Sequence, residues 1–433
     1  MPKKVLIITY YWPPAGGIAV QRWIKFAKYL HEYGWQPIIY TVSNGDYPLI
    51  DNSKSKDVAE NTVVIKQPIW EPYQLYRLFS PKKNKQSGRA DIKSKQTASL
   101  MQKISIWFRG NFFIPDARMF WVKPSVKFLN DYLSHNKVDA IISTGPPHST
   151  HLIALGVKKK MNVAWLADFR DPWTSMDYYK DLMLTKWADK KHHRLEKEVL
   201  QQADAVSVVG AAMQKEFEPK RGKPVDVVTN GFDNADFEVG EIKLDSDFSI
   251  VHIGSLYERR NPVSLWKAVG ELKKENHPCM ASLKIKMIGK VDAQIVAIAK
   301  SLGLESHLEV TDHVQHREAI QRMLSAQILL LPIDNFEGAQ WVLTGKLFEY
   351  LAAHRPILCI GPVNGDAANV IAETKAGNTF DFDDVVAIKN YLIQKHQQFE
   401  KNELYLNENS AQIYSHQQLA KQVAGILNKI NKQ

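Results

Sequence analysis

The sequence predicts an α/β protein with two domains, each built on a parallel sheet, and three observations support this. Short apolar runs of strand length alternate with helical stretches along the 433 residues. Near the start, the run Val5–Tyr11 leads into Pro13-Pro14-Ala15-Gly16-Gly17 and then a helical stretch. In the second half, Ser249–Ile253 ends at Gly254 and leads into the basic stretch Ser255–Arg260. A strand that breaks at glycine into a helix start exposes N–H groups to an anion, so two such starts predict two nucleotide-binding-like domains with a cleft between them.

The expected strands are apolar runs separated by turn residues. They are 4–11, 37–42, 62–67, 139–144, 162–168, 205–210 and 225–229 in the first half, and 249–253, 283–288, 308–311, 328–333 and 356–360 in the second. Residues 18–33 place Val20, Ile24, Ala27 and Leu30 on one helical stripe, with Gly34 where a helix would end. The turn-rich, acidic stretch 230–247 predicts a domain boundary at 235/236, and the residues from 407 onward have the pattern of a single helix.

Composition limits the class of protein. With 45% hydrophobic residues the chain can bury full cores. Its two cysteines, Cys279 and Cys359, exclude a disulfide framework and favour a reducing compartment. No apolar run approaches the roughly 18 residues that span a bilayer, and the N-terminus has no signal-peptide pattern. We therefore expect a cytoplasmic protein. No His/Asp cluster has metal-ligand spacing, so no metal is expected.

Much of the net charge of +10 lies in residues 70–113. Between 81 and 110 a single acid, Asp91, accompanies Lys82, Lys83, Lys85, Arg89, Lys93, Lys95, Lys103 and Arg109. Next to them lie Trp70, Tyr73, Tyr76, Phe79, Ile104, Ile106, Trp107, Phe108, Phe112 and Phe113. This mixture fits an anionic membrane surface, whereas no motif for nucleic acid accompanies it. The alternative is a solvent-exposed loop beside an ordinary helix whose aromatic face is buried in the core.

The sharpest local pattern is the helix expected over residues 344–353. Lys346 and Glu349 are three residues apart, close to its N-terminus, while Leu347 and Leu351 can face a core. A carboxylate there can accept two ribose hydroxyls, and a lysine with free N–H groups suits a phosphate. The alternative is a surface ion pair on an ordinary amphipathic helix.

The chain carries a series of motifs whose order resembles that of the retaining GT-B glycosyltransferases of family 4 (glycosyl transferases group 1). The resemblance covers nearly the full length. The motifs are Pro13–Gly17, Ser143–Ser149, Asp168–Trp173, Thr229–Asp233, Gly254–Asn261 and Lys346–Ala353. The resemblance implies two facing Rossmann-like domains, with the acceptor held by 1–235 and a nucleotide-sugar by 236–406. A C-terminal helix, 407–433, would pack back on the first domain.

The resemblance also implies roles in the second domain. Glu349 matches the second glutamate of the E-x7-E pattern, which binds ribose, but Trp341 stands where the first glutamate is usual. Glu337 could replace that glutamate only if the loop were longer than usual.

A basic pair usually holds the diphosphate in this family. Arg260 occupies the usual lysine place, while Ser255 stands in the arginine place, so Arg259 or Lys346 would supply the second charge. Cations and N–H groups directed at the departing diphosphate stabilise the transition state, so no metal or other cofactor is required.

In the first domain, Gly16 and Gly17 would let the backbone approach the phosphate where a Cβ would intrude, unless they form only a tight turn. Asp168, Arg170 and Asp171 follow a strand and should point into the cleft, where a carboxylate could orient the acceptor hydroxyl or stabilise oxocarbenium charge. The alternative is an Asp–Arg pair that fixes the turn. His148 also ends a strand and could either reach the acceptor or serve the structure.

The leading interpretation is therefore a glycosyltransferase that uses a nucleotide-sugar and a lipid-linked or polysaccharide acceptor in cell-surface glycan synthesis. A nucleotide-sugar 2-epimerase shares the same architecture and is the second interpretation. A nucleotide-binding scaffold without activity is the third, motivated by Trp341 in the first-glutamate place.

Overall fold

A computed structural model describes residues 2–60, 62–72, 100–176, 179–404 and 410–432. The chain divides into two compact units. Unit 1 comprises Met1–Thr229 with His416–Gln433, and unit 2 comprises Asn230–Ser415. The chain thus passes between the units at 229/230 and at 415/416, where the sequence suggested 235/236 and 406/407.

Unit 1 is built on a seven-stranded sheet of order β3-β2-β1-β4-β5-β6-β7, in which all neighbours are parallel. Its strands are β1 (Lys3–Ile8), β2 (Trp35–Val42), β3 (Val63–Gln67), β4 (Ala140–Gly145), β5 (Ala164–Phe169), β6 (Ala205–Val208) and β7 (Asp226–Val227). Its helices are α1 (Ile18–Leu30), α3 (Leu100–Phe112), α4 (Met119–His135), α5 (Ser149–Met161), α6 (Lys186–Gln202), α7 (Ala211–Arg221) and α14 (His416–Ile430). Strand order reverses between β1 and β4, and ligands of such sheets bind beyond the carboxyl ends at that point.

Unit 2 repeats the plan with a six-stranded parallel sheet of order β10-β9-β8-β11-β12-β13. Its strands are β8 (Phe248–Ile253), β9 (Leu283–Ile288), β10 (Leu308–Thr311), β11 (Ile328–Pro332), β12 (Ile357–Ile360) and β13 (Gly377–Phe380). Its helices are α8 (Val263–Lys274), α9 (Ala293–Ser301), α10 (His316–Ser325), α11 (Gly345–Ala352), α12 (Asp366–Thr374) and α13 (Val385–Glu400). Here the order reverses between β8 and β11.

The predicted α/β class with two parallel sheets is confirmed, and each expected strand is present with small shifts at its ends. Edge strand β13 was not expected, because Gly377-Asn378-Thr379-Phe380 has no apolar run. A Cβ at Gly377 would collide with the backbone of Ile357, so glycine allows β13 to approach β12 closely. The last helix was expected from 407, but α14 begins only at His416, after a short 3₁₀ turn at Gln412–Tyr414.

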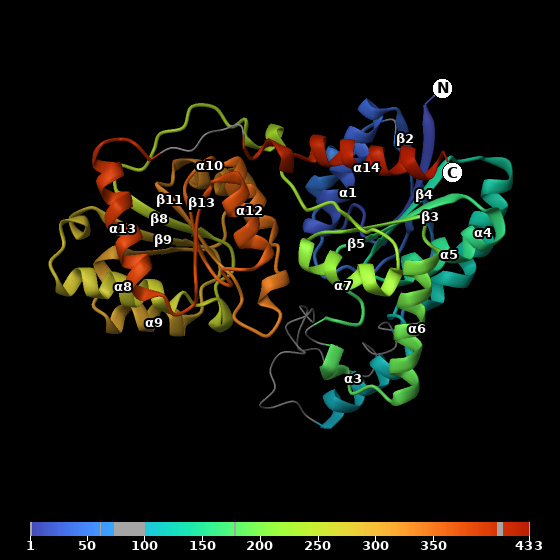
Figure 1. The fold of residues 1–433 in the computed structure, drawn as a ribbon, viewed down its shortest axis with the longest axis horizontal. Coiled ribbons are helices and arrows are strands. Elements are labelled where there is room, and N and C mark those ends of the chain that lie inside the picture. The colour runs from blue at the N-terminus through green and yellow to red at the C-terminus, as the bar shows by residue number, and fades with distance from the viewer. Residues whose placement is uncertain (1, 61, 73–99, 177–178, 405–409, 433) are drawn as a thin grey trace. The chain divides into compact units, whose positions relative to one another are not determined.

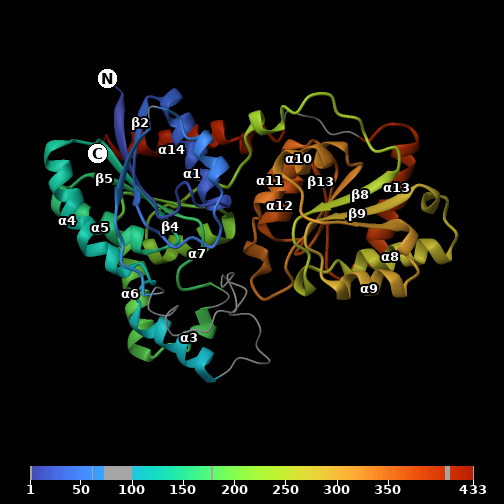
Figure 2. The ribbon, with the colours of Figure 1, turned by 180° about the vertical axis from the view of Figure 1, so that it is seen from behind.

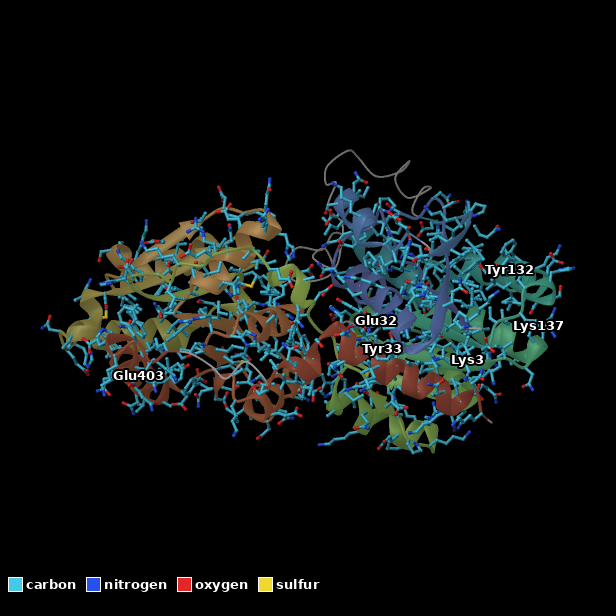
Figure 3. All side chains as sticks on the ribbon, turned by 90° about the horizontal axis from the view of Figure 1, so that it is seen from above. Lys3, Glu32, Tyr33, Tyr132, Lys137 and Glu403 are labelled. Carbon is cyan, nitrogen blue, oxygen red and sulfur yellow. The ribbon has the colours of Figure 1, made fainter. Side chains whose placement is uncertain are left out.

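Helix α14 packs on α1 within unit 1 (Figure 1). One side of it is apolar, and that side joins the core cluster made by α1 and the neighbouring face of the sheet: Leu419, Ala420, Val423, Ala424, Ile426, Leu427 and Ile430. Polar contacts flank this side, since Gln417 donates to Glu32 at 2.7 Å and Lys3 to Asn428 at 3.4 Å. Figure 3 labels Lys3 and Glu32 beside this helix. Burial of the apolar stripe is what holds the end of the chain on unit 1.

Helix α3 packs against the 3₁₀ turn Tyr179–Leu182 and against α6, as Figures 1 and 2 both show. Asn111 fastens this contact by donating to the Met183 carbonyl at 3.2 Å and accepting from the Thr185 N–H at 2.7 Å. Most of the basic residues predicted for the membrane surface, from Lys82 to Lys95, lie outside the described residues. None of the described helices is both long enough and apolar enough to cross a bilayer.

We predict that Leu427→Ala destabilises unit 1. Leu427 is fully buried between α14 and α1, so the truncation leaves a cavity that should cost about 2–5 kcal/mol. Urea unfolding followed by tryptophan fluorescence measures this, because nine of the eleven tryptophans lie in unit 1. Leu49→Ala, at a leucine 56% exposed, is the control and should change stability by about 0.5 kcal/mol or less. Equal effects of the two substitutions would contradict the packing.

Candidate functional site

In unit 2, the turn after β8 and the start of α11 lie side by side at the point where strand order reverses. Gly254 ends β8 with a φ of 135°, a conformation that favours glycine. A Cβ at this position would lie 3.8 Å from Cε of Lys346 and 3.7 Å from Nε2 of His252. Lys346 Nζ bonds the Glu349 carboxylate at 2.7 Å, with 34% and 20% of the two side chains exposed. The predicted pair therefore stands half-open beside a glycine turn, at the N-terminus of a helix.

Arg260 reaches the same edge from the short helical turn Glu258–Arg260. Its Nε donates to Asp334 at 2.5 Å, and the Tyr257 hydroxyl donates to the other Asp334 oxygen at 2.8 Å. The guanidinium lies over the Tyr257 ring, 5.0 Å from its centroid. Asp334 follows β11, the strand next to β8, and was not predicted from the sequence. It fixes the position of Arg260 while using only Nε of the guanidinium.

His252 lies beneath this turn and is also absent from the predictions. Nδ1 of His252 lies 3.0 Å from the Leu330 carbonyl, which can only accept, so this nitrogen carries the proton. Nε2 is then an acceptor, and it is buried without a hydrogen-bond partner among the described residues. Burial, together with the Arg260 and Lys346 charges and against the opposing effect of the Leu330 hydrogen bond, lowers the pKa of His252 to about 4. The ring is therefore neutral near pH 7 and adds no charge to the site.

The other residues named for the second domain have different surroundings. Arg259 is exposed, and its carbonyl accepts from the Asn335 N–H at 2.8 Å. Trp341 ends the 3₁₀ turn Ala339–Trp341 just before α11 and is half-buried, while Glu337 is exposed in the preceding loop. Lys346 and Arg260 thus supply the cations around Gly254, with Lys346 the nearer to the glycine turn.

In unit 1, Asp168 is buried. One of its oxygens accepts from Arg22 Nη2 and Ser207 Oγ, both at 2.9 Å, and the other accepts from Thr144 Oγ1 at 2.9 Å. Only 2% of its side chain is exposed. This corrects the expectation that the carboxylate points into an open cleft, and the Asp–Arg alternative applies with Arg22 as the partner.

Arg22 extends this buried link. It also donates to the carbonyls of Val228 and Thr229, so a single side chain of α1 connects the end of β5 with the segment after β7. The role of Arg22 as the partner of Asp168 could not be recognised from the sequence, because α1 and β5 are far apart in the chain.

Arg170 and Asp171 are half-buried at the carboxyl edge of the same sheet. Arg170 donates to Thr144 Oγ1 at 3.0 Å and to the Pro146 carbonyl, and its guanidinium lies 6.0 Å from the Tyr11 ring centroid. Burial lowers the pKa of Arg170 from its ordinary value, while Asp171 and Asp168 oppose that shift. Arg170 thus joins the turns that follow β1, β4 and β5.

His148 lies just before α5, at the point where the strand order of unit 1 reverses. It is 7% exposed and stacks on Trp173 with ring centroids 4.7 Å apart and an angle of 3°. Burial lowers the pKa of His148 well below the ordinary value, and repulsion from the protonated forms of His151 and His192 and from Arg170 acts in the same direction. His151 and His192, which the sequence did not single out, are buried close by.

The two predicted glycines have separate local causes. A Cβ at Gly16 would lie 3.0 Å from side-chain atoms of both Leu49 and Asp51, so close packing favours glycine there. Gly17 precedes α1 with a φ of 96° and has open space where a Cβ would point. The tight turn is therefore present, and an approach to phosphate stays a prediction.

No family model matches the sequence, and no curated protein does. Solved structures resemble it over nearly the full length. A glycosyltransferase from Rickettsia africae matches with a TM-score of 0.62 at 12% identity, covering 99% of this chain and 98% of the other. Anabaena HepE in complex with UDP-glucose matches with a TM-score of 0.54 at 13% identity over 99% and 98%. A putative UDP-N-acetylglucosamine 2-epimerase from Listeria monocytogenes gives 0.51 at 10% over 99% and 96%. The chain therefore has the GT-B fold that was expected.

We predict that Asp168→Asn lowers the stability of the protein much more than Asp171→Asn does. The first leaves buried Arg22 without its counter-charge, which should cost about 3–5 kcal/mol. The second alters a half-exposed group and should cost about 1 kcal/mol or less. Urea unfolding followed by tryptophan fluorescence compares the two. Wild-type stability of Asp168→Asn would refute the structural role given to this carboxylate.

Proposed function

We propose that the protein is a glycosyltransferase that moves a sugar from a nucleotide-sugar to a lipid-linked or polysaccharide acceptor, with retention of configuration, in cell-surface glycan synthesis. The observation that carries the proposal is the half-open Lys346–Glu349 pair beside Gly254 at the start of α11. The similar structures support it, because they include glycosyltransferases and one complex with UDP-glucose.

The pair has the chemistry of a nucleoside-diphosphate site. In this structure Lys346 and Glu349 neutralise one another at 2.7 Å. A nucleotide offers each of them a replacement partner, since ribose hydroxyls can donate to the carboxylate and the diphosphate can accept from the ammonium. Arg260, held by Asp334, adds a second cation for the charge that grows on the departing diphosphate. We propose that these residues, and no metal, stabilise that charge.

The 2-epimerase and the inactive scaffold differ from the transferase in what becomes of the donor. Incubation with a panel of labelled nucleotide-sugars separates the three interpretations. Release of nucleoside diphosphate with a new glycoside, or by hydrolysis, indicates a transferase, whereas an epimeric nucleotide-sugar indicates an epimerase. Binding with neither product indicates a scaffold, and Trp341 in place of a glutamate is the feature that would explain it.

A lipid-linked acceptor would require access to a membrane from the cytoplasmic side, and unit 1 has a surface with suitable chemistry. We call it the α3–α6 arm, meaning Trp70, α3, Phe120 and residues 179–191. Its exposed large apolar side chains are Trp70, Ile104, Trp107, Phe108, Phe112, Phe120, Met183 and Trp187, of which Trp187 is 64% exposed. Ring contacts of 4.5 to 6.1 Å run from Trp107 through Phe112, Phe108, Phe113 and Phe120 to Trp70.

The arm is also basic. Its described cations are Lys103, Arg109, Lys180, Lys186, Lys190 and Lys191, against the acids Asp181 and Asp189. Lys191 lies over the Trp187 ring at 4.8 Å. Trp and Phe rings suit the interface of a bilayer, and each basic residue near an anionic surface contributes about 1 kcal/mol. We propose that the membrane surface expected for 70–113 includes the start of α6.

We predict that Glu349→Ala and Arg260→Ala each weaken nucleotide binding while the fold stays intact. Loss of a charged hydrogen-bond partner should cost about 1.5–3 kcal/mol, roughly ten- to a hundredfold in Kd. Calorimetry against UDP, GDP and ADP measures this. The exposed residues Glu309 and Lys300 of unit 2 provide matched controls as Glu309→Ala and Lys300→Ala. Unchanged affinity of both site variants for a nucleotide that the wild type binds would contradict the assignment.

We predict that the protein sediments with anionic liposomes and that high salt releases it. Lys186→Gln with Lys190→Gln should weaken binding by about 2 kcal/mol, roughly thirtyfold. The variant Trp107→Ser with Trp187→Ser should also bind less. Its control, Val310→Ser with Val386→Ser, changes two exposed apolar residues of unit 2 and should bind like the wild type. Equal binding to neutral and anionic liposomes would show that the arm is not a docking surface.

A further inference from the structure

A line of buried polar side chains runs beneath His148. The Trp165 indole N–H donates to Ser143 Oγ at 2.9 Å, and Ser143 Oγ lies 2.8 Å from His151 Nδ1. All three residues are fully buried. Ser143 has no other side-chain hydrogen bond among the described residues, so its hydroxyl proton is satisfied only if it points to His151. A buried hydroxyl proton left unpaired would destabilise the fold.

This geometry fixes the proton of His151. Since Nδ1 accepts from Ser143, the neutral ring carries its proton on Nε2. Burial and, to a smaller extent, the charge on Arg170 lower the pKa of His151 to about 3, so the ring stays neutral near pH 7. His151 Nε2 is therefore a buried donor, and it has no hydrogen-bond partner among the described residues.

The donor lies near a nitrogen of His148, and no hydrogen bond joins the two. A Cβ added at Gly145 would lie 2.5 Å from His151 Nε2 and 3.1 Å from His148 Nδ1, so both atoms border the same small space. His148 Nδ1 is also buried and has no partner within the described part of the chain. If His148 Nδ1 carried a proton, two N–H groups would border this space, and neither has an acceptor among the described residues. As an acceptor, it complements the N–H of His151.

The plane of His148 is fixed independently. Its ring stacks on Trp173, whose indole N–H donates to His192 Nδ1 at 3.0 Å. The ring has therefore little freedom to turn, and the remaining question is which nitrogen carries the proton.

We propose that the buried chain Trp165–Ser143–His151 fixes the tautomer of His148, with Nδ1 as the acceptor and the proton on Nε2. His148 then presents an N–H donor from the reversal point of the unit 1 sheet. Ser143 and His151 are positioning residues, which act through His148. In the transferase proposed above, on which this reading of the role rests, the N–H would bind an oxygen of the acceptor or the transferred sugar.

The test is 15N solid-state NMR of histidine-labelled full-length protein near pH 7, where protonated and bare ring nitrogens have separate shifts. The His148→Gln spectrum assigns the His148 signals. We expect a neutral His148 with a bare Nδ1 and a protonated Nε2. His151→Phe removes the N–H donor, and Ser143→Ala removes the hydroxyl that keeps the proton of His151 on Nε2. Each should bring a second His148 tautomer to at least a tenth of the signal, a ratio at which only about 1.3 kcal/mol of preference remains. Ser125→Ala, which removes a buried hydroxyl on α4, should leave the His148 signals unchanged.

A charged His148, or a proton on its Nδ1 in the wild type, would overturn the proposal. So would unchanged His148 signals in both His151→Phe and Ser143→Ala. The wild-type spectrum decides the tautomer even if one variant does not fold. None of these spectra requires a substrate. Failure of the tautomer proposal is therefore distinguishable from failure of the proposed transferase activity, which the panel of labelled nucleotide-sugars measures.

Discussion

Parallel pairing is the constraint on which the rest of the structure depends. Because every strand pair in both sheets is parallel, all the loops that follow strands gather at one edge of their sheet. Strand order reverses at β1/β4 and at β8/β11, so the turns after these four strands meet in pairs. In unit 2 this brings Gly254 and Asp334 to one place, and in unit 1 it brings the Tyr11 turn to the loop before His148. The chemistry of each unit is assembled by its topology.

The sequence predicted the elements well and the side-chain contacts poorly. Apolar periodicity identified every strand that has an apolar run, and it failed at β13, which a glycine contact with Ile357 defines. Lys346 and Glu349 could be paired from their spacing, because helix geometry alone places them together. Partners distant in the chain carry no such signal. Arg22 with Asp168, Asp334 with Arg260 and His252 with Leu330 became visible only once the strands were ordered.

Burial separates the charges that hold unit 1 together from those available to a ligand. Asp168 and Arg22 are both almost completely buried and paired with one another, as the cost of burying a charge demands. Lys346 and Glu349 retain exposure of 34% and 20%, so water screens their pairing and a ligand can exchange with either partner at small cost. The sequence predicted both Asp168 and Glu349 as site residues. Their surroundings in the structure give them different roles.

The buried histidines extend this distinction to neutral groups. His148, His151 and His252 all have a pKa lowered by burial, so none carries charge near neutral pH. For a neutral imidazole, function depends on which nitrogen bears the proton, and that is decided by the partner of the other nitrogen. The Leu330 carbonyl decides it for His252, and Ser143 decides it for His151. A backbone carbonyl can only accept, whereas a serine hydroxyl can reorient, so the His252 tautomer is fixed more firmly than that of His151. The orientation of the Ser143 hydroxyl is nevertheless fixed. Its oxygen accepts from the Trp165 indole, and its proton has no partner other than His151 in the described chain.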